Sequence, residues 1–154
     1  MKILIVVFIL GCGAFNSLFG QEEDYRAMRK QLSTLSCGKV DSVSVYETKL
    51  KLESMDTTKI VKDLDYYYRD LAWCFYRNFM LHYDTTYLKL DILNYTKSLY
   101  HKPQNTQALW GVLFGYYKLG DCLNGKKYLD LYLKYADAKE VNKEQIERLK
   151  KNCD

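Results

Sequence analysis

Side chains able to act as nucleophiles, acids, bases or metal ligands are few and scattered along this chain. The two histidines, His82 and His101, are isolated, and no two cysteines show the spacing of a metal site. The eight glycines form no phosphate-binding loop. Acid pairs such as Asp63 and Asp65 lie in charged stretches, with no neighbour that would raise a carboxyl pKa. The sequence therefore predicts no catalytic, metal or cofactor site, and no enzyme.

The first 20 residues have the layout of a secretory signal peptide. Lys2 precedes an unbroken apolar run from Ile3 to Leu10, and small residues follow up to Gly20. The run is shorter than the ~20 apolar residues needed to span a bilayer. Cleavage after Gly20 would leave a soluble periplasmic or secreted protein that begins at Gln21.

A second processing route is open at Cys12. The sequence Ile9-Leu10-Gly11-Cys12 resembles a bacterial lipobox, in which the cysteine becomes the lipidated first residue. Leu10 is larger than the residue usually found at its position, and the apolar run ahead of it is short. This route would give an envelope lipoprotein anchored at Cys12.

The chain after residue 20 has the size and composition of one folded domain. Removal of 20 of the 154 residues leaves 134, and the formal charge falls from +4 to +3 because only Lys2 is lost. Basic and acidic residues are interleaved and form no concentrated basic stripe, so nucleic acid is not an expected partner. Residues 21–154 are therefore predicted to form a single domain.

Four cysteines remain in this domain, and an even number in an exported protein permits disulfides. They are Cys37, Cys74, Cys122 and Cys153, which allow three pairings. Cys122 is expected to open one helix and Cys153 to end the last one, so they could form a disulfide if that helix folds back. Cys74 lies among large apolar residues, which favours a buried free thiol.

Apolar residues recur at helical spacing through the whole domain, which predicts an all-α fold. Residues 40–55 partly alternate as in a strand, but no second strand candidate exists for them to pair with. The predicted helices are Glu22–Leu35, Val40–Met55, Lys59–Leu81, Thr85–His101, Thr106–Leu119, Asp121–Ala136 and one that runs from the cap Asn142 to about Lys151.

Residues 106–133 resemble a tetratricopeptide repeat. The resemblance is carried by small, aromatic and turn residues at the family's positions, namely Ala108, Gly115, Tyr116, Gly120, Asp121 and Gly125. The last of these, Gly125, stands where the two helices of a pair pack most closely. Pro103 and Asn105 match the end of a preceding repeat.

A second, longer unit resembles the same repeat upstream. Its residues are Tyr68, Leu71, Ala72 and Phe75 in a first helix and Ile92, Tyr95, Ser98 and Leu99 in a second. About seven extra residues near Arg77 to Tyr83 predict that each helix is longer than the family norm by about one turn. Leu113, Asp91 and Tyr132 occupy positions where the family has small residues, so we expect wider helix packing that is filled by tyrosine.

The resemblance implies stacked antiparallel helix pairs with a concave groove that binds peptides. It implies that the flanking helices cap the stack, the last one through Ile146 and Leu149. The groove positions that it implies are Tyr66, Arg69, Trp73, Tyr76, Arg77, Gln107, Trp110, Phe114, Tyr117 and Lys118. Trp, Tyr and Arg dominate binding hot spots, and the cations favour an acidic segment or a free carboxylate.

Two functions agree with these features. The first is an adaptor or scaffold of the bacterial cell envelope that binds a protein or peptide in the groove. The second is a periplasmic inhibitor or immunity protein that blocks one toxin or enzyme. The sequence leaves the partner and the oligomeric state open.

Overall fold

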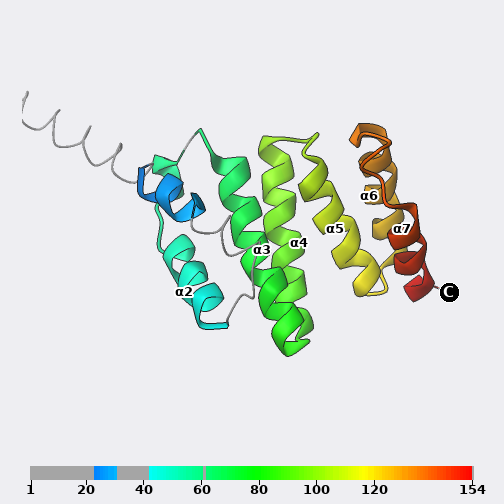
Figure 1. Cartoon of the computed structure of the whole chain (residues 1–154), viewed down its shortest axis with the longest axis horizontal. Helices are drawn as coiled ribbons and strands as arrows, with labels where there is room; N and C mark the ends of the chain where they lie inside the picture. Colours follow the sequence, from blue (N-terminus) through cyan, green and yellow to red (C-terminus); the bar gives the residue numbers. More distant parts are fainter. Residues whose placement is uncertain (1–22, 31–41, 61, 154) are drawn as a thin grey trace, which may run out of the picture.

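The computed structural model describes residues 23–30, 42–60 and 62–153. Within these ranges every regular element is a helix, and the helices stand side by side in a row that follows the order of the chain (Figure 1). The predicted all-α fold class is therefore confirmed, and the pairwise packing is consistent with a helical-repeat fold. The predicted signal peptide, Cys12 and Cys37 lie outside the described residues.

The row begins with a short helix, described for residues 23–30. The elements that follow are α2 (Ser42–Glu53), η1 (Thr57–Lys59), α3 (Leu64–His82), α4 (Thr85–His101), α5 (Thr106–Lys118), α6 (Cys122–Tyr135), α7 (Lys143–Lys150) and η2 (Lys151–Cys153).

Side-chain caps fix where the later helices begin. The side chains of Asp84, Asn105, Asp121 and Asn142 each accept a hydrogen bond from a backbone N–H in the first turn of α4, α5, α6 and α7, respectively. Tyr83 ends α3 in the left-handed conformation, with φ 55°. The predicted bounds of α4 agree with the structure at both ends, and those of α5 and α6 agree to within one residue.

One predicted boundary is wrong, because α3 begins at Leu64 and not at Lys59. The side chain of Asp56 accepts from the backbone N–H of Thr58 and caps the short helix η1. The backbone then leaves helical geometry at Ile60, with φ −114° and ψ 38°. Since Ile60 is fully buried, its side chain anchors this turn in the core and does not extend the apolar face of α3.

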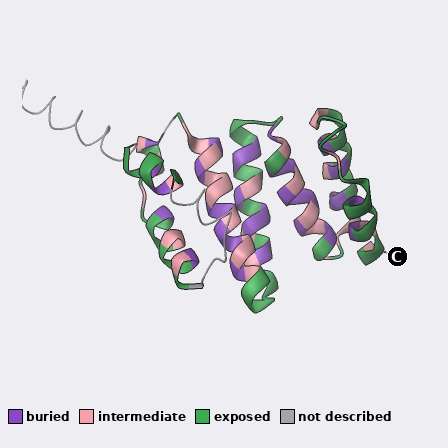
Figure 2. Cartoon of the chain, viewed as in Figure 1, coloured by how far each residue is buried: buried purple, intermediate pink, exposed green. Residues whose placement is uncertain are grey.

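Glycines allow the helices of the row to approach closely. A Cβ at Gly115 of α5 would lie 2.5 Å from Cγ1 of Ile92 in α4, and one at Gly125 of α6 would lie 3.1 Å from the ring of Tyr117 in α5. The predicted role of Gly125 as a close-packing point is therefore confirmed. Figure 2 shows that the buried residues face the neighbouring helices along the row.

The helices α3 and α4 form a first pair, and α5 and α6 form a second. Smaller elements cover both ends of the stack that these two pairs make. At one end, Tyr25 of the first helix and Val45 and Leu52 of α2 join the core against α3. At the other end, Ile146 and Leu149 of α7 are buried beside α5, as the sequence predicted. The helices α3 and α4 have 19 and 17 residues and α5 and α6 have 13 and 14, so the predicted extra length of the first pair is confirmed.

The cysteines of the described ranges take two different roles. A disulfide joins Cys122, at the start of α6, to Cys153 in η2 and ties the last helix to the second pair. Cys74 of α3 is a buried free thiol, and burial raises its pKa to about 12, so it stays uncharged at neutral pH. Among the described helices, none is long and apolar enough to cross a membrane.

Gly115→Ala tests the close approach of α4 and α5. A methyl group forced against Ile92 should cost about 1 to 3 kcal/mol, which outweighs the gain in helix propensity of about 1 kcal/mol. We expect a lower free energy of unfolding in urea, whereas Lys126→Ala on the exposed face of α6 should change it by less than about 0.5 kcal/mol. An unchanged stability for Gly115→Ala would contradict the packing described here.

Asp91→Asn tests a buried carboxyl group. Asp91 is 1% exposed, and its Oδ1 has no hydrogen-bond partner in the described part of the chain. Burial raises its pKa well above the ordinary 3.8, so the folded state holds this proton more tightly than the unfolded state does.

The stability that Asp91 contributes is therefore complete below the unfolded pKa and is lost as pH rises above it. Asp91→Asn should match the wild type in urea unfolding near pH 3.5 and become increasingly more stable than it from about pH 4 upward. The exposed Asp130→Asn should show no such trend. A difference that does not change with pH would rule out the buried carboxyl as its cause.

Candidate binding groove

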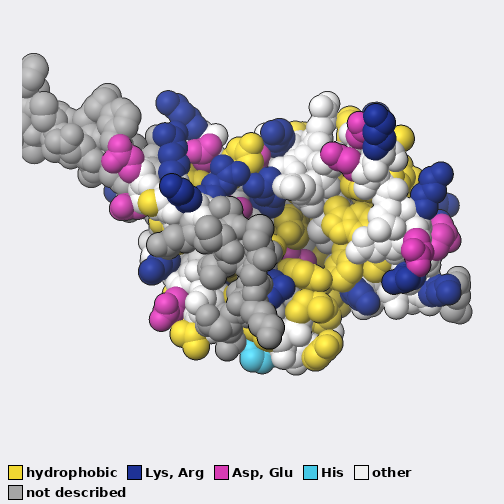
Figure 3. Space-filling view, viewed as in Figure 1, with side chains coloured by type: hydrophobic (Ala, Val, Ile, Leu, Met, Phe, Trp, Pro, Cys, Tyr) yellow, Lys and Arg dark blue, Asp and Glu magenta, His cyan; other side chains and the backbone are white. Residues whose placement is uncertain are grey.

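A groove of about 740 Å³ lies where α3, α5 and the segment leading into α7 face one another. Figure 3 shows hydrophobic side chains over the middle of the row, with Lys and Arg side chains beside them near the start of α3. The lining residues come from six helices and one connecting segment. They are Arg29, Arg69, Asp70, Trp73, Tyr95, Thr106, Gln107, Trp110, Tyr132, Glu140, Asn142 and Gln145.

Four of the predicted groove residues line this groove. Arg69 and Trp73 lie on α3, and Gln107 and Trp110 lie on α5. The helices α3 and α5 form two walls of the groove. An Nη1–H of Arg69 donates to Oε1 of Gln107 over 2.7 Å, so these side chains connect the two walls in the first half of both helices. The two tryptophans are half-buried, and the ring of Trp110 lies 5.4 Å from that of Tyr132.

Five other predicted residues do not line the groove. Tyr66 lies beside Arg29, which does line it. The rings of Tyr76 and Phe114 contact each other edge to face at 5.4 Å between α3 and α5. The guanidinium of Arg77 lies 5.7 Å from the ring of Trp73, and Nζ of Lys118 lies 5.6 Å from the ring of Phe114.

Tyr117 requires a correction, because the structure places it in the core and not on the groove. It is 4% exposed, and its ring packs against Gly125 of α6. The missing side chain at position 125 leaves room for this ring, which therefore turns toward α6.

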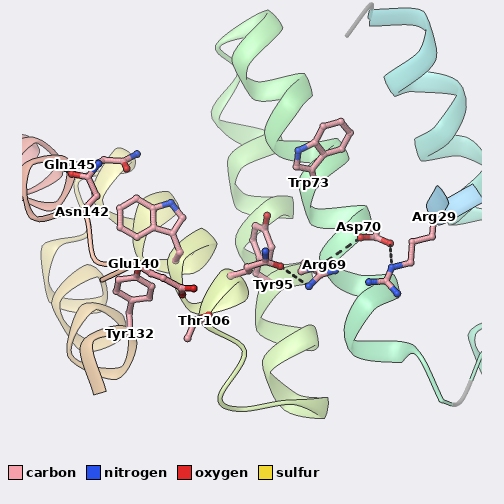
Figure 4. A pocket seen from close by; sticks show the side chains of 12 residues that line it. Arg29, Arg69, Asp70, Trp73, Tyr95, Thr106, Tyr132, Glu140, Asn142 and Gln145 are labelled. Carbon is pink, nitrogen blue, oxygen red and sulfur yellow. Dashed lines mark hydrogen bonds and ion pairs between the residues drawn. The ribbon is translucent and has the colours of Figure 1, made fainter. Parts of the chain in front are cut away.

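The floor of the groove was not predicted. Tyr95 of α4 stands between the two walls, where Figure 4 shows it beside Arg69 and Trp73. It reaches this place because Gly111 of α5 has no side chain, and a Cβ there would overlap the Tyr95 ring. The sequence places Tyr95 on the core face of its helix and Tyr132 at a position where the repeat family has a small residue. The signal in the sequence that could have indicated the groove floor is a large aromatic residue, Tyr95, on one helix and a glycine, Gly111, on the next.

Asp70 is the centre of a polar network at one end of the groove. The hydroxyl of Tyr25 donates to its Oδ2 over 2.9 Å, and Nε of Arg29 lies 3.5 Å from the same oxygen. Nε of Arg69 lies 3.9 Å from Oδ1 (Figure 4). Burial raises the pKa of Asp70, while the Tyr25 hydrogen bond and the two arginines oppose that rise. The network ties the first helix to α3.

Cations outnumber anions among the described residues that line the groove at this end. Around the ring of Tyr66 lie the guanidinium carbon of Arg29 at 3.7 Å, that of Arg69 at 4.7 Å and Nζ of Lys102 at 5.7 Å. In the described lining, Asp70 is the one carboxylate at this end, and it is shared by both arginines. The local charge therefore favours an anionic ligand.

A third wall comes from the segment around the start of α7. Asn142 caps α7 by accepting from the backbone N–H of Gln145, and both residues line the groove together with Glu140. This wall depends on the position of α7. The Cys122–Cys153 disulfide fixes that position, because Cys153 lies in η2, directly after the C-terminal end of α7.

The groove offers aromatic faces, hydrogen-bond donors and cations for binding. Asp70 already interacts with three donors, which leaves it poorly placed to take a proton from a substrate. In the described residues no group of His, Cys, Asp and Glu side chains could hold a metal ion.

Comparison with models of known protein families, with curated proteins and with solved structures finds no match to this chain. The resemblance to tetratricopeptide repeats therefore remains a prediction that rests on the sequence motifs.

Removal of the disulfide tests the α7 wall. Cys122 and Cys153 are 31 residues apart, and closure of such a loop contributes about 3 to 4 kcal/mol in the chain-entropy model. In the double variant Cys122→Ser/Cys153→Ser we expect a lower midpoint of thermal unfolding. By hydrogen exchange, residues 143–150 should lose protection while α3 and α4 keep theirs. Equal loss of protection in all helices would contradict a local role for the disulfide.

Proposed function

We propose that this protein is an exported adaptor or scaffold of the bacterial cell envelope that binds a peptide segment of a partner protein in the groove. The observation that carries this proposal is the groove itself, with Trp73 and Trp110 half-buried on opposite walls. Large aromatic side chains that are held by their neighbours and remain partly exposed to solvent provide contact area, and they lose little conformational entropy on binding.

The shape and charge of the groove support a peptide as the ligand. Its volume of about 740 Å³ suits a few residues of an extended chain and not a flat protein surface. The cations at the Tyr66 end favour a segment with an acidic side chain or a free carboxylate. Export is part of the proposal and rests on the signal-peptide layout of residues 1–20.

Selection from a library of displayed random 12-residue peptides with free C-termini tests this function. We expect enrichment of peptides that bind the wild type at micromolar strength. Arg69→Gln and Trp110→Ala should each weaken their binding at least about tenfold. Leu123→Ala, at a side chain 82% exposed on α6 and outside the groove, should bind normally.

The inhibitor hypothesis gives a different result in this experiment. An inhibitor would enrich no peptide and would instead form a stable one-to-one complex, at nanomolar strength or better, with one folded toxin or enzyme. That outcome would replace the adaptor proposal. Circular dichroism of each variant separates a lost contact from a lost fold.

A further inference from the structure

The middle of the groove has hydrogen-bond donors that have no partner in the described part of the chain. Trp73 and Trp110 carry indole N–H groups, which can only donate, and Tyr95 and Tyr132 carry phenol hydroxyls, which can donate and accept. None of these four groups makes a hydrogen bond within the described part of the chain. Burial raises the pKa of both tyrosines, so each keeps the proton that it can donate.

The carboxylate and amide acceptors that α3 and α5 place beside these donors are occupied. Asp70 receives a hydrogen bond from Tyr25 and pairs with two arginines, and Oε1 of Gln107 accepts from Arg69. Toward α7, Oδ1 of Asn142 is used as a helix cap. A ligand that satisfies the indole donors of α3 and α5 must therefore bring acceptors of its own.

The apolar side chains that line the groove are aromatic. Among its described lining residues none is Leu, Ile, Val or Met, so this part of the groove offers flat ring faces. Aromatic-lined grooves of this kind suit polyproline II segments, whose rigid shape loses little entropy on binding. Such a segment leaves its backbone carbonyls free to accept hydrogen bonds, and each proline lacks the N–H donor.

A carbohydrate fits the same aromatic faces less well. Sugar hydroxyls donate as readily as they accept, and the carboxylate and amide oxygens of the described lining that accept no hydrogen bond, those of Glu140 and Gln145, lie at its α7 end. The cations around Tyr66 add a requirement for negative charge at the other end.

The geometry points to a proline-containing extended segment as the occupant of the groove, with an acidic side chain or a free carboxylate that reaches Arg29 and Arg69. This inference rests on the proposed peptide-binding function and names the class of peptide. The proline rings lie on the faces of Trp73 and Trp110, and the backbone carbonyls accept from the indole and phenol donors.

The composition of peptides selected from the random library is the first test. We expect Pro together with Asp, Glu or a C-terminal carboxylate to be enriched over the unselected library. Replacement of the prolines by alanine in a selected peptide should weaken binding at least about tenfold, and so should replacement of its acids by amides. Binding is followed by tryptophan fluorescence, because the only two tryptophans of the chain both line the groove.

Tyr95→Phe tests the donors separately, because it removes a hydroxyl and keeps the ring that fills the space beside Gly111. We expect affinity to fall about three- to tenfold, whereas Tyr46→Phe, at an exposed tyrosine of α2, should leave it unchanged. Urea unfolding of both variants shows whether the fold is affected.

Two negative outcomes are distinguishable. Enriched peptides that lack proline, or that bind equally well after Pro→Ala replacement, would overturn this inference and leave the peptide-binding function intact. A library that yields no binder would overturn both. A mixture of soluble chitin oligosaccharides that changes the tryptophan fluorescence where no peptide does would assign the groove to glycans instead.

Discussion

The contact between Tyr95 and Gly111 determines whether this stack of helices has a groove. An aromatic ring placed between α3 and α5 keeps the two helices apart, so that each packs on α4 and much less on the other. Had position 111 carried a side chain, the ring could not occupy this space. The groove is thus a consequence of core packing.

The sequence predicted the framework well, because the framework follows from local rules. Helix starts at Thr85 and Thr106 are set by the preceding Asp84 and Asn105, and such caps can be read directly from residue types. The start of α3 was misplaced because Ile60 continues the helical spacing while its backbone turns away. The spacing of apolar residues indicates which side chains can face the core, but it does not indicate where the backbone leaves helical geometry.

The groove was predicted only in part, for a related reason. The walls at Trp73 and Trp110 lie where the repeat pattern places exposed positions. The floor at Tyr95 and the third wall at Glu140 depend on contacts between elements far apart in the chain. Tyr117 turns into the core because its space is created by Gly125 on another helix. A pattern along one helix does not contain this information.

The first helix pair is longer than the second, and no described helix covers the excess. Figure 1 shows the turn between α3 and α4 projecting beyond the ends of α2 and α5. Met80 and Leu81 are each 42% exposed there, and Tyr83 is 75% exposed. The groove-lining residues of α3, from Arg69 to Trp73, lie between the sixth and the tenth of its 19 residues, away from this turn. The projecting turn is therefore the most permissive place in the row for added sequence, where an epitope or a small domain could be inserted while the binding surface stays unchanged.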